Sequence, residues 1–427
     1  MTEGKPVVAV DIGTSKVVTI IAKVDEESVN VMGVSEVRAG GIKKGQIVDI
    51  EEAVLSINSS IEGSERMAGL SASHIIASVG GSHIESQNSR GVVAVSQPQG
   101  EISPADITRV IEAARAISLP SSREIIHVLP RTYTVDGQEG IKDPVGMTGV
   151  RLEVETHIVT AGSTSLRNME KAFSEVGVDV DAIVFGGYAS SLSALTDTER
   201  ELGVVLVDLG AGTTEISIYV EGSVAYSSVL PIGARHITND LAIGLRISLE
   251  SAEKVKLHLS RPKKSIVTED SLLGKEQRSD DLDLSNLGLA EQLTKVSQKT
   301  LVDGIIRPRL NEIFTMVGLE IKKSGYGGQT PSGLVVTGGG GRTVGVVDCA
   351  KRMLAMPVRI GTPQNMKGII DEIQDSAYST VVGLAMYGGG IETLSSLPFG
   401  VKMPQIANVN LSGVPKKIID LIKSFIP

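Results

Sequence analysis

Two aspartates stand at the ends of short apolar runs and directly before glycine turns. Residues 6–10 lead into Asp11, and residues 203–207 lead into Asp208. Valine-rich runs of this length predict buried strands. A carboxylate at the end of such a strand can hold Mg²⁺, most readily through water, because Mg²⁺ gives up its hydration shell reluctantly. Asp11 and Asp208 are therefore the predicted metal-binding residues.

The segments that follow the two aspartates could bind phosphate. Each aspartate is followed two residues later by a glycine, Gly13 or Gly210, and then by hydroxyl residues. A glycine turn presents its backbone N–H groups without a Cβ in the way, so that a phosphate can approach them. A second apolar run follows each turn. Each unit should therefore be a β-hairpin with a phosphate-sized tip.

A third glycine turn, residues 338–341, follows the apolar run 334–337. A flat ring could lie close to its backbone. One Asp-x-Gly-Thr sequence arises often by chance, but two copies, each between two strands, favour internal duplication around a ligand site. Ligands collect at such strand ends in α/β folds. The alternative is three unrelated tight turns.

Composition limits the class of protein. At 427 residues the chain is long enough for two or more domains. The net charge of −9 argues against general nucleic-acid binding. The single cysteine, Cys349, can form no internal disulfide, which indicates a reducing cytosol. Neither a signal peptide nor an apolar stretch long enough to cross a bilayer is visible, so we expect a soluble or peripheral protein.

The first half of the chain must position the first turn. It predicts strands near 7–12, 17–24, 29–35 and 75–79, and a helix near 51–67. Residues 84–160 show a different pattern of predicted elements, with strands at 91–96, 125–135 and 153–161 and one helix. That helix begins with Ser103 as N-cap and has Pro104 in its first turn. We interpret this stretch as a compact insert. Residues 164–196 return to helix, strand (182–185) and helix.

The second half opens at Gly203 and must position the other two turns. We expect helices near 234–243 and 249–259, an exposed loop at 260–288, and a helical stretch at about 289–324. Helices are also expected at 343–355 and 376–387, followed by a linker at 391–413.

Residues 414–427 read as a short amphipathic helix. Its apolar face holds Ile418, Leu421, Ile422 and Phe425, widened by Ile419 and Ile426, and its polar face holds Lys416, Lys417, Asp420, Lys423 and Ser424. Such a helix behind a tether predicts an interfacial membrane anchor, which would bind firmly only when several copies act together. The alternative is an ordinary terminal helix docked on the body.

Together these motifs resemble the actin/Hsp70/sugar-kinase superfamily and, in detail, the FtsA family of actin-like bacterial cell-division proteins. The resemblance covers residues 5–390 by specific motifs and the tail by type. The most telling stretches are Asp11–Lys16, Gly140–Val154, Glu199–Thr214, Thr337–Gly341 and the terminal helix.

The resemblance implies an α/β fold: a two-lobed actin-like ATPase with an inserted FtsA-type subdomain and a C-terminal amphipathic helix. The first lobe would comprise residues 1–83 and 163–200, separated by the inserted subdomain at 84–162. The second lobe would comprise 201–232, a nucleotide-side subdomain at 233–305 and the stretch 306–390. The linker 391–413 and the membrane helix 414–427 would follow.

The resemblance also implies ATP and Mg²⁺ as cofactors. The phosphate-binding residues would be Gly13, Thr14, Ser15 and Lys16 in the first turn and Gly210, Ala211, Gly212, Thr213 and Thr214 in the second. Gly338, Gly339 and Gly340 would lie under the adenosine. Glu253 and Lys256 resemble an acid and base that touch ribose and adenine in the superfamily, although such a charge pair on a helix is often only a solvated face.

One departure from the superfamily affects the expected activity. Actin-like ATPases usually carry a Gln or Glu near the hinge helix, whereas residues 185–191 here contain neither an acid nor an amide. Phosphoryl transfer depends on positioning and charge stabilisation. We therefore expect slow ATP hydrolysis at most, with nucleotide acting mainly as a conformational ligand.

By resemblance, the protein would polymerise into filaments on the cytoplasmic face of the inner membrane at the division site. It would bind anionic lipids, tether FtsZ through the FtsZ tail and recruit later divisome proteins, and it would bind no nucleic acid. Lys299, Arg307 and Arg309 could pair with the acidic FtsZ tail, or could be a solvated helix face. The rival interpretations are a sugar or acyl kinase and an actin-like scaffold of type IV pilus assembly.

Overall fold

The computed structural model describes residues 5–25, 28–96, 100–261, 280–291, 293–369 and 373–390. Contacts divide the chain into residues 1–394 and 395–427, and all the described residues belong to the first unit. The predicted linker and the predicted membrane helix 414–427 lie outside the described residues. Among the helices that are described, none is both long and apolar enough to cross a membrane.

The first half forms a six-stranded sheet. Its strands, in spatial order, are β11 (Asp179–Phe185), β6 (His74–Val79), β1 (Lys5–Ile12), β2 (Lys16–Val24), β3 (Val29–Arg38) and β19 (Met366–Gly368). The strands β1, β2 and β3 are antiparallel neighbours, whereas β6 and β11 continue the sheet in parallel. The first aspartate turn is thus the tip of the β1–β2 hairpin, as the sequence predicts.

A second sheet repeats this arrangement. Its strands, in spatial order, are β14 (Ser223–Leu230), β13 (Thr214–Val220), β12 (Val204–Leu209), β17 (Leu334–Thr337) and β18 (Val358–Ile360). Three antiparallel strands are again followed by two parallel ones, and β12–β13 occupies the place of β1–β2. The predicted α/β fold with two related halves is confirmed, and the repeated topology favours duplication over unrelated turns.

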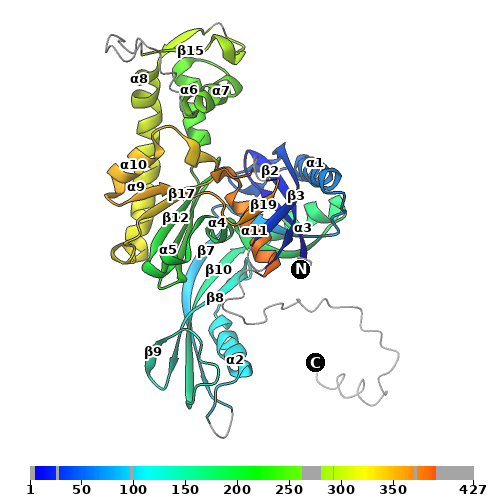
Figure 1. The fold of residues 1–427 in the computed structure, drawn as a ribbon, viewed down its shortest axis with the longest axis vertical. Helices are drawn as coiled ribbons and strands as arrows, with labels where there is room; N and C mark the ends of the chain where they lie inside the picture. Colours follow the sequence, from blue (N-terminus) through cyan, green and yellow to red (C-terminus); the bar gives the residue numbers. More distant parts are fainter. Residues whose placement is uncertain are drawn as a thin grey trace, which may run out of the picture. The chain divides into compact units, whose positions relative to one another are not determined.

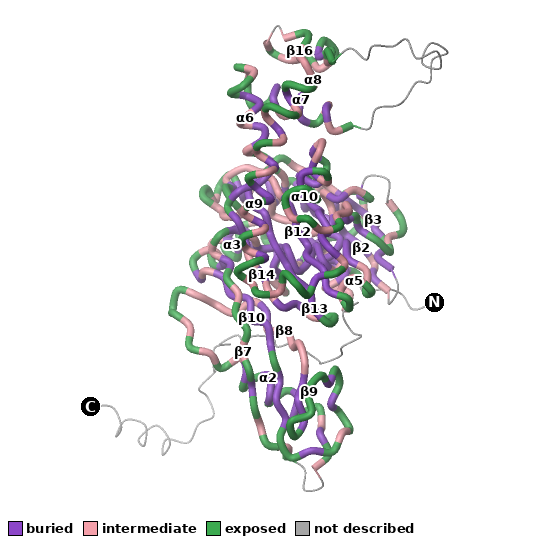
Figure 2. The backbone as a smooth tube through the Cα atoms, turned by 90° about the vertical axis from the view of Figure 1, so that its left-hand side faces the viewer, coloured by how far each residue is buried: buried purple, intermediate pink, exposed green. Residues whose placement is uncertain are grey.

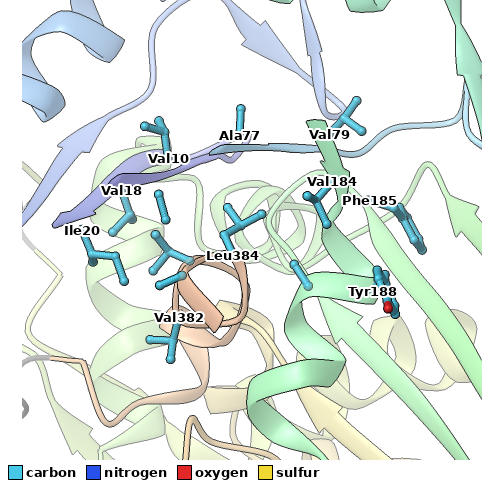
Figure 3. Packing of buried hydrophobic residues seen from close by; sticks show 14 of the residues in the cluster. Val10, Val18, Ile20, Ala77, Val79, Val184, Phe185, Tyr188, Val382 and Leu384 are labelled. Carbon is cyan, nitrogen blue, oxygen red and sulfur yellow. The ribbon is translucent and has the colours of Figure 1, made fainter. Parts of the chain in front are cut away.

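Two crossing helices pack between the sheets, α4 (Gly186–Ala194) and α11 (Ser379–Gly389). They pack closely, because a Cβ on Gly383 of α11 would come within 1.7 Å of the Ala189 carbonyl oxygen of α4. Figure 3 shows Val382 and Leu384 of α11 among Val10, Val18 and Ile20 of the first sheet. This packing fixes the strand ends that carry the aspartates.

Other helices cover the outer faces of the sheets. On the first sheet lie α1 (Ile50–Ala68), which Asp49 caps, and α3 (Ser163–Val176); on the second lie α9 (Arg307–Ser324) and α10 (Val346–Leu354) (Figure 1). Burial is concentrated in the central strands, such as β2 and β12 (Figure 2).

The insert is a separate antiparallel sheet. Its strands, in order, are β7 (Glu85–Ala94), β10 (Arg151–Gly162), β8 (Arg123–Val135) and β9 (Gln138–Ile141), and α2 (Pro104–Arg115) packs against them. The predicted N-cap is present, because Ser103 and Asp106 form a reciprocal capping box. The predicted insert is therefore present as a separate sheet with a helix packed on it.

Buried histidines bond the insert to both halves. His127 of β8 accepts a hydrogen bond from the Phe185 backbone N–H of the first sheet at 2.9 Å. His157 of β10 bonds through one ring nitrogen to Asn88 at 2.7 Å and through the other to Ser227 of the second sheet at 3.0 Å. The insert therefore contacts both sheets through specific polar groups.

The sequence prediction was wrong around residues 281–297. Residues 281–283, placed in an exposed loop, form β15 (Asp281–Asp283), and the predicted helix from 289 contains β16 (Lys295–Ser297) instead. The two short strands pair, and Leu282 and Val296 pack against the second core. Helical structure begins only with α8 (Gln298–Leu301), which continues through a π-helical turn (Val302–Ile306) into α9. Two strands of three residues carry too few alternating positions to show a period.

Other boundaries moved by a few residues. The strand predicted at 91–96 begins at Glu85, and the helix predicted from 376 begins as a 3-10 turn (Ser376–Tyr378) before α11. The predictions missed β9, β18, β19 and a short helix, α5 (Asp197–Leu202). The strands β18 and β19 are three-residue sheet edges, which only pairing with distant strands defines.

The buried histidines predict a loss of stability in mild acid. Burial lowers the pKa of His127 to about 4; burial, with the charges of Arg131 and His127, lowers the pKa of His157 to about 3. An unfolded histidine takes up a proton near pH 6.5, so stability is present above that pH and is lost as the pH falls toward 4. We expect each histidine to cost about 1 kcal/mol of unfolding free energy by pH 5.5.

Urea unfolding at pH 7.5 and 5.5 measures this loss. His157→Gln should lose less stability between the two pH values than the unsubstituted protein does. His127→Gln should reduce the loss in the same way, because burial lowers the pKa of that histidine as well. Equal losses in all three proteins would contradict the assignment.

Candidate functional site

The two hairpin turns have the same internal bond. In the first, the Gly13 N–H donates to the Lys16 carbonyl at 3.0 Å, and in the second, the Gly210 N–H donates to the Thr213 carbonyl at 2.9 Å. Cβ atoms at the two glycines would lie 2.8 Å and 3.0 Å from those same carbonyl oxygens. The turns therefore match in conformation as well as in sequence, and each leaves backbone where a side chain could not fit.

The two turns also meet each other. A Cβ on Gly212 would lie 2.6 Å from the Thr14 hydroxyl oxygen, so the tip of the second turn touches the side chain of the first. Thr14 in turn accepts a hydrogen bond from the Gly45 N–H at 3.1 Å. The structure thus brings together predicted phosphate-binding residues from both halves.

The third glycine turn reaches the same place. Strand β17 lies beside β12 with Thr337 opposite Asp208, and Gly338 follows with a φ of +79°. A Cβ on Gly338 would lie 2.2 Å from Asp208 Oδ1, and one on Gly340 would lie 2.7 Å from the Leu209 carbonyl oxygen. Only glycine fits both the conformation and the space. We call residues 11–16, 208–214 and 338–341 the three-turn site.

Both predicted metal-binding aspartates lie in this site, where Asp208 is buried and Asp11 is partly buried. Ser78 donates to Asp11 Oδ1 at 2.7 Å, and Thr380 donates to Asp208 Oδ2 at 2.9 Å. Burial raises the pKa of Asp11; burial, followed by the charge of Asp11, raises the pKa of Asp208 to about 6. A nearby cation would favour the ionised form of both carboxylates.

These residues fit a hydrated Mg²⁺ ion bound together with a phosphate. Among the described residues, no cluster of three or more acidic, histidine or cysteine ligands could hold a metal by itself. Mg²⁺ commonly keeps several waters and binds through one or two carboxylates plus phosphate oxygens. Two aspartates beside glycine turns are a donor set of that kind.

Glu215 is a third buried acid, which the sequence reasoning missed. It lies opposite Asp208 in the β12–β13 register, and its Oε2 atom has no hydrogen-bond partner among the described residues. Its carboxylate lies against Gly80 and Gly186, where Cβ atoms would come within 2.1 and 2.6 Å of its oxygens. Burial, followed by the charges of Asp208 and Asp11, raises its pKa well above the ordinary value.

Glu215 brings a carboxylate close to residues 185–191, which contain neither an acid nor an amide. Those residues open α4, and the carboxylate approaches them from β13 of the other sheet. A signal was present in the sequence, because a glutamate directly after Thr213 and Thr214 interrupts an otherwise apolar strand. That signal could not reveal which helix the carboxylate would face.

Glu253 and Lys256 lie on α7 (Leu249–Ser260) and pair at 2.7 Å. The hydroxyl of Thr238, on α6 (Arg235–Leu245), donates to Glu253 at 2.5 Å and accepts from Lys256 at 2.9 Å. Lys256 is only 7% exposed, so the solvated-face alternative does not describe it. Thr238 is a further member of this cluster that the sequence reasoning missed.

The predicted partner-binding cations have different surroundings. Arg309 bonds to Asp240 at 2.6 and 2.9 Å and also to Glu312, and Arg307 pairs with Asp303 at 2.7 Å. Lys299 is exposed, and no acid among the described residues forms an ion pair with it. An open groove of about 230 Å³ lies nearby, lined by Asp240, Gly304, Ile305, Pro308, Arg309 and Glu312.

The predicted membrane-binding residues, Lys416 to Ile426, lie outside the described residues.

Family models match two parts of the chain. Residues 81–160 match the family described as "SHS2 domain inserted in FTSA", which is the insert. Residues 205–383 match the family described as "Cell division protein FtsA".

Curated relatives match most of the chain. It is 38% identical over 388 residues to "Cell division protein FtsA" of Pseudomonas aeruginosa, covering 90% of this chain and 89% of the relative. It is 38% identical over 382 residues to the protein of that name from Borreliella burgdorferi, covering 89% and 90%.

Solved structures share the fold at low identity. The "PilM-PilN type IV pilus biogenesis complex" gives a TM-score of 0.63 at 14% identity, covering 90% of this chain and 98% of the solved chain. The structure of MreB5 of Spiroplasma citri bound to ADP gives a TM-score of 0.52 at 14% identity, covering 92% and 97%. These likenesses bear on the fold alone, and they agree with an actin-like architecture.

The contact between the turns can be tested by substitution. We expect Gly212→Ala to lower the unfolding free energy by about 1–3 kcal/mol, because the new methyl group would overlap Thr14. In a double-mutant cycle, Thr14→Ala should recover part of that loss.

Gly328→Ala is the matched control, because a Cβ there would have no neighbour within 4 Å. Urea denaturation measures all four variants. Independent, additive effects of Gly212→Ala and Thr14→Ala would mean that the two turns do not touch.

Proposed function

The chain belongs to the FtsA family of cell-division proteins, and from this membership we propose that it binds ATP with Mg²⁺ at the three-turn site. The observation that carries the proposal is the convergence of two matching hairpin turns and a third glycine turn on the buried Asp208. An MreB5 protein with a similar fold was solved with ADP, which is in keeping with this proposal.

In this proposal, different residues bind different parts of the nucleotide. The turns 13–16 and 210–214 take the phosphates through backbone N–H groups other than those of Gly13 and Gly210, which close the turns by their internal bonds. Asp11 and Asp208 hold the hydrated Mg²⁺. The glycines 338–340 lie under the adenosine, and Glu253 and Lys256 serve the ribose and adenine.

We also assign Glu215 a role in ATP hydrolysis. A buried carboxylate with an unpartnered oxygen beside the phosphate turns can orient a water molecule for attack. The same burial raises its pKa, so hydrolysis depends on how far bound cations restore its charge. We therefore propose that ATP is hydrolysed slowly and that Glu215 is the residue that orients the attacking water.

Glu215→Ala tests this role. We expect ATP turnover to fall about 100-fold, because the methyl group can neither orient the attacking water nor accept its proton. Affinity for ATP should change by less than about threefold, which separates the role from damage to the site. Unchanged turnover in the variant would remove Glu215 from the reaction.

We further propose that the protein forms filaments on the inner membrane, tethers FtsZ and recruits later divisome proteins. The groove beside α6 and α9 suits a short peptide, because it offers Ile305 and Pro308 as apolar contacts. The exposed Lys299 is better placed to meet an acidic tail than Arg307 or Arg309, since both arginines already have acidic partners. Residues 414–427 provide the membrane helix, and filaments provide the multivalency that so short a helix needs.

Electron microscopy on anionic lipid monolayers, with ATP and Mg²⁺, tests the membrane and filament proposals together. The full-length protein should form lipid-bound filaments, and a variant without residues 414–427 should leave the monolayer bare. Equal binding by both proteins would contradict the anchor. A pilus-type scaffold is not expected to depend on the tail, and robust ATP turnover that needs a sugar would favour the kinase.

A further inference from the structure

Lys16, Glu36 and Tyr378 form a closed triangle next to the three-turn site. The Lys16 ammonium lies 2.7 Å from Glu36 Oε2 and 3.9 Å from the centre of the Tyr378 ring. The Tyr378 hydroxyl donates to the same Glu36 oxygen at 2.7 Å. One carboxylate oxygen therefore accepts hydrogen bonds from both other members, and the ammonium also rests on the face of the ring.

The triangle joins two different parts of the site. Lys16 ends the first phosphate turn, and Glu36 lies on the adjacent strand β3. Tyr378 ends the 3-10 turn Ser376–Tyr378, which is fastened to the third glycine turn by two bonds of 3.0 Å between Ser376 and Gly338. Two residues further on, Thr380 donates to Asp208. Tyr378 thus links the lysine of the first turn to the segment that supports the other two.

In this arrangement the Lys16 ammonium already has two partners, the Glu36 carboxylate and the Tyr378 ring. Partial burial alone would raise the pKa of Glu36, but the hydrogen bonds from Lys16 and Tyr378 outweigh it and hold that pKa below the ordinary value. Glu36 is therefore an anion at neutral pH. An incoming phosphate must compete with it for the ammonium, because one lysine cannot keep both contacts at full strength.

We propose that Glu36 and Tyr378 are positioning residues that hold Lys16, and that the nucleotide phosphates draw Lys16 away from Glu36 and off the ring of Tyr378. The inference rests on the proposed ATP site and deepens it. When Lys16 leaves the Tyr378 ring, phosphate binding at the first turn changes the surroundings of the segment that is bonded to the third glycine turn. Removal of the Glu36 charge should free Lys16 and tighten ATP binding, even though a native ion pair is lost.

Glu36→Gln tests the competition. We expect it to bind a fluorescent ATP analogue with Mg²⁺ about three- to fivefold more tightly than the unsubstituted protein, which is the range of a partly exposed ion pair. A purely structural role would give the opposite sign, since a damaged site binds more weakly. Glu36→Asp, which withdraws the carboxylate by one methylene, should tighten binding less and serves if Glu36→Gln does not fold.

Glu201→Gln is the matched control. Glu201 also pairs with a lysine at 2.7 Å, Lys142, on an exposed part of the surface. Its loss should leave ATP affinity unchanged.

The state of Tyr378 can be read directly. The chain has seven tyrosines, so ¹⁹F NMR of protein labelled with 3-fluorotyrosine is tractable, and Tyr378→Phe identifies the Tyr378 resonance. ATP with Mg²⁺ should shift that resonance. Glu36→Gln without nucleotide should already move it toward the ATP-bound position.

The outcomes separate the two proposals. Tight ATP binding by the unsubstituted protein, together with equal or weaker binding by Glu36→Gln and a Tyr378 resonance that ATP does not shift, would overturn the inference and leave the ATP site standing. If the unsubstituted protein binds no ATP, both proposals are overturned.

Discussion

The structure depends on buried negative charge at the point where its two halves meet. Asp11, Asp208 and Glu215 come from two sheets. Beyond the rise that burial causes, the charge of Asp11 raises the pKa of Asp208, and the charges of Asp208 and Asp11 raise the pKa of Glu215. Burying several acids together costs free energy unless the protein or a ligand compensates them. The hydroxyls of Ser78 and Thr380 offset part of that cost, and Lys16 lowers the pKa of Asp11. Such a site favours the binding of a cation together with an anion that coordinates the cation.

The repeated topology explains how one site can be built from two halves. Each sheet ends its first strand in an aspartate and turns at once through glycine, so the two hairpin tips are equivalent by construction. The close crossing of α4 and α11 fixes how the sheets meet, since Gly383 leaves no room for a side chain against Ala189. The position of the three-turn site therefore follows from core packing rather than from the turns themselves.

Part of the three-turn site could be predicted, because its residues follow one another closely in the sequence. Asp11, Asp208 and the glycines could be found because a strand, an acid and a turn follow one another within a few residues. Glu215 could be noticed as a charged residue in an apolar strand, but its neighbours Gly80 and Gly186 are distant in sequence. Tyr378 and Glu36, which are 342 residues apart, gave no signal at all. The strand pairs that the sequence did not predict, such as β15–β16, likewise depend on partners rather than on their own period.

The insert adds a second link between the halves, away from the three-turn site. His127 bonds to the first sheet and His157 to the second, and both contacts are buried. A buried hydrogen bond that opens without water costs the desolvation of both partners, so these contacts resist separation. The insert and the three-turn site are therefore both attached to the two sheets that carry the aspartates.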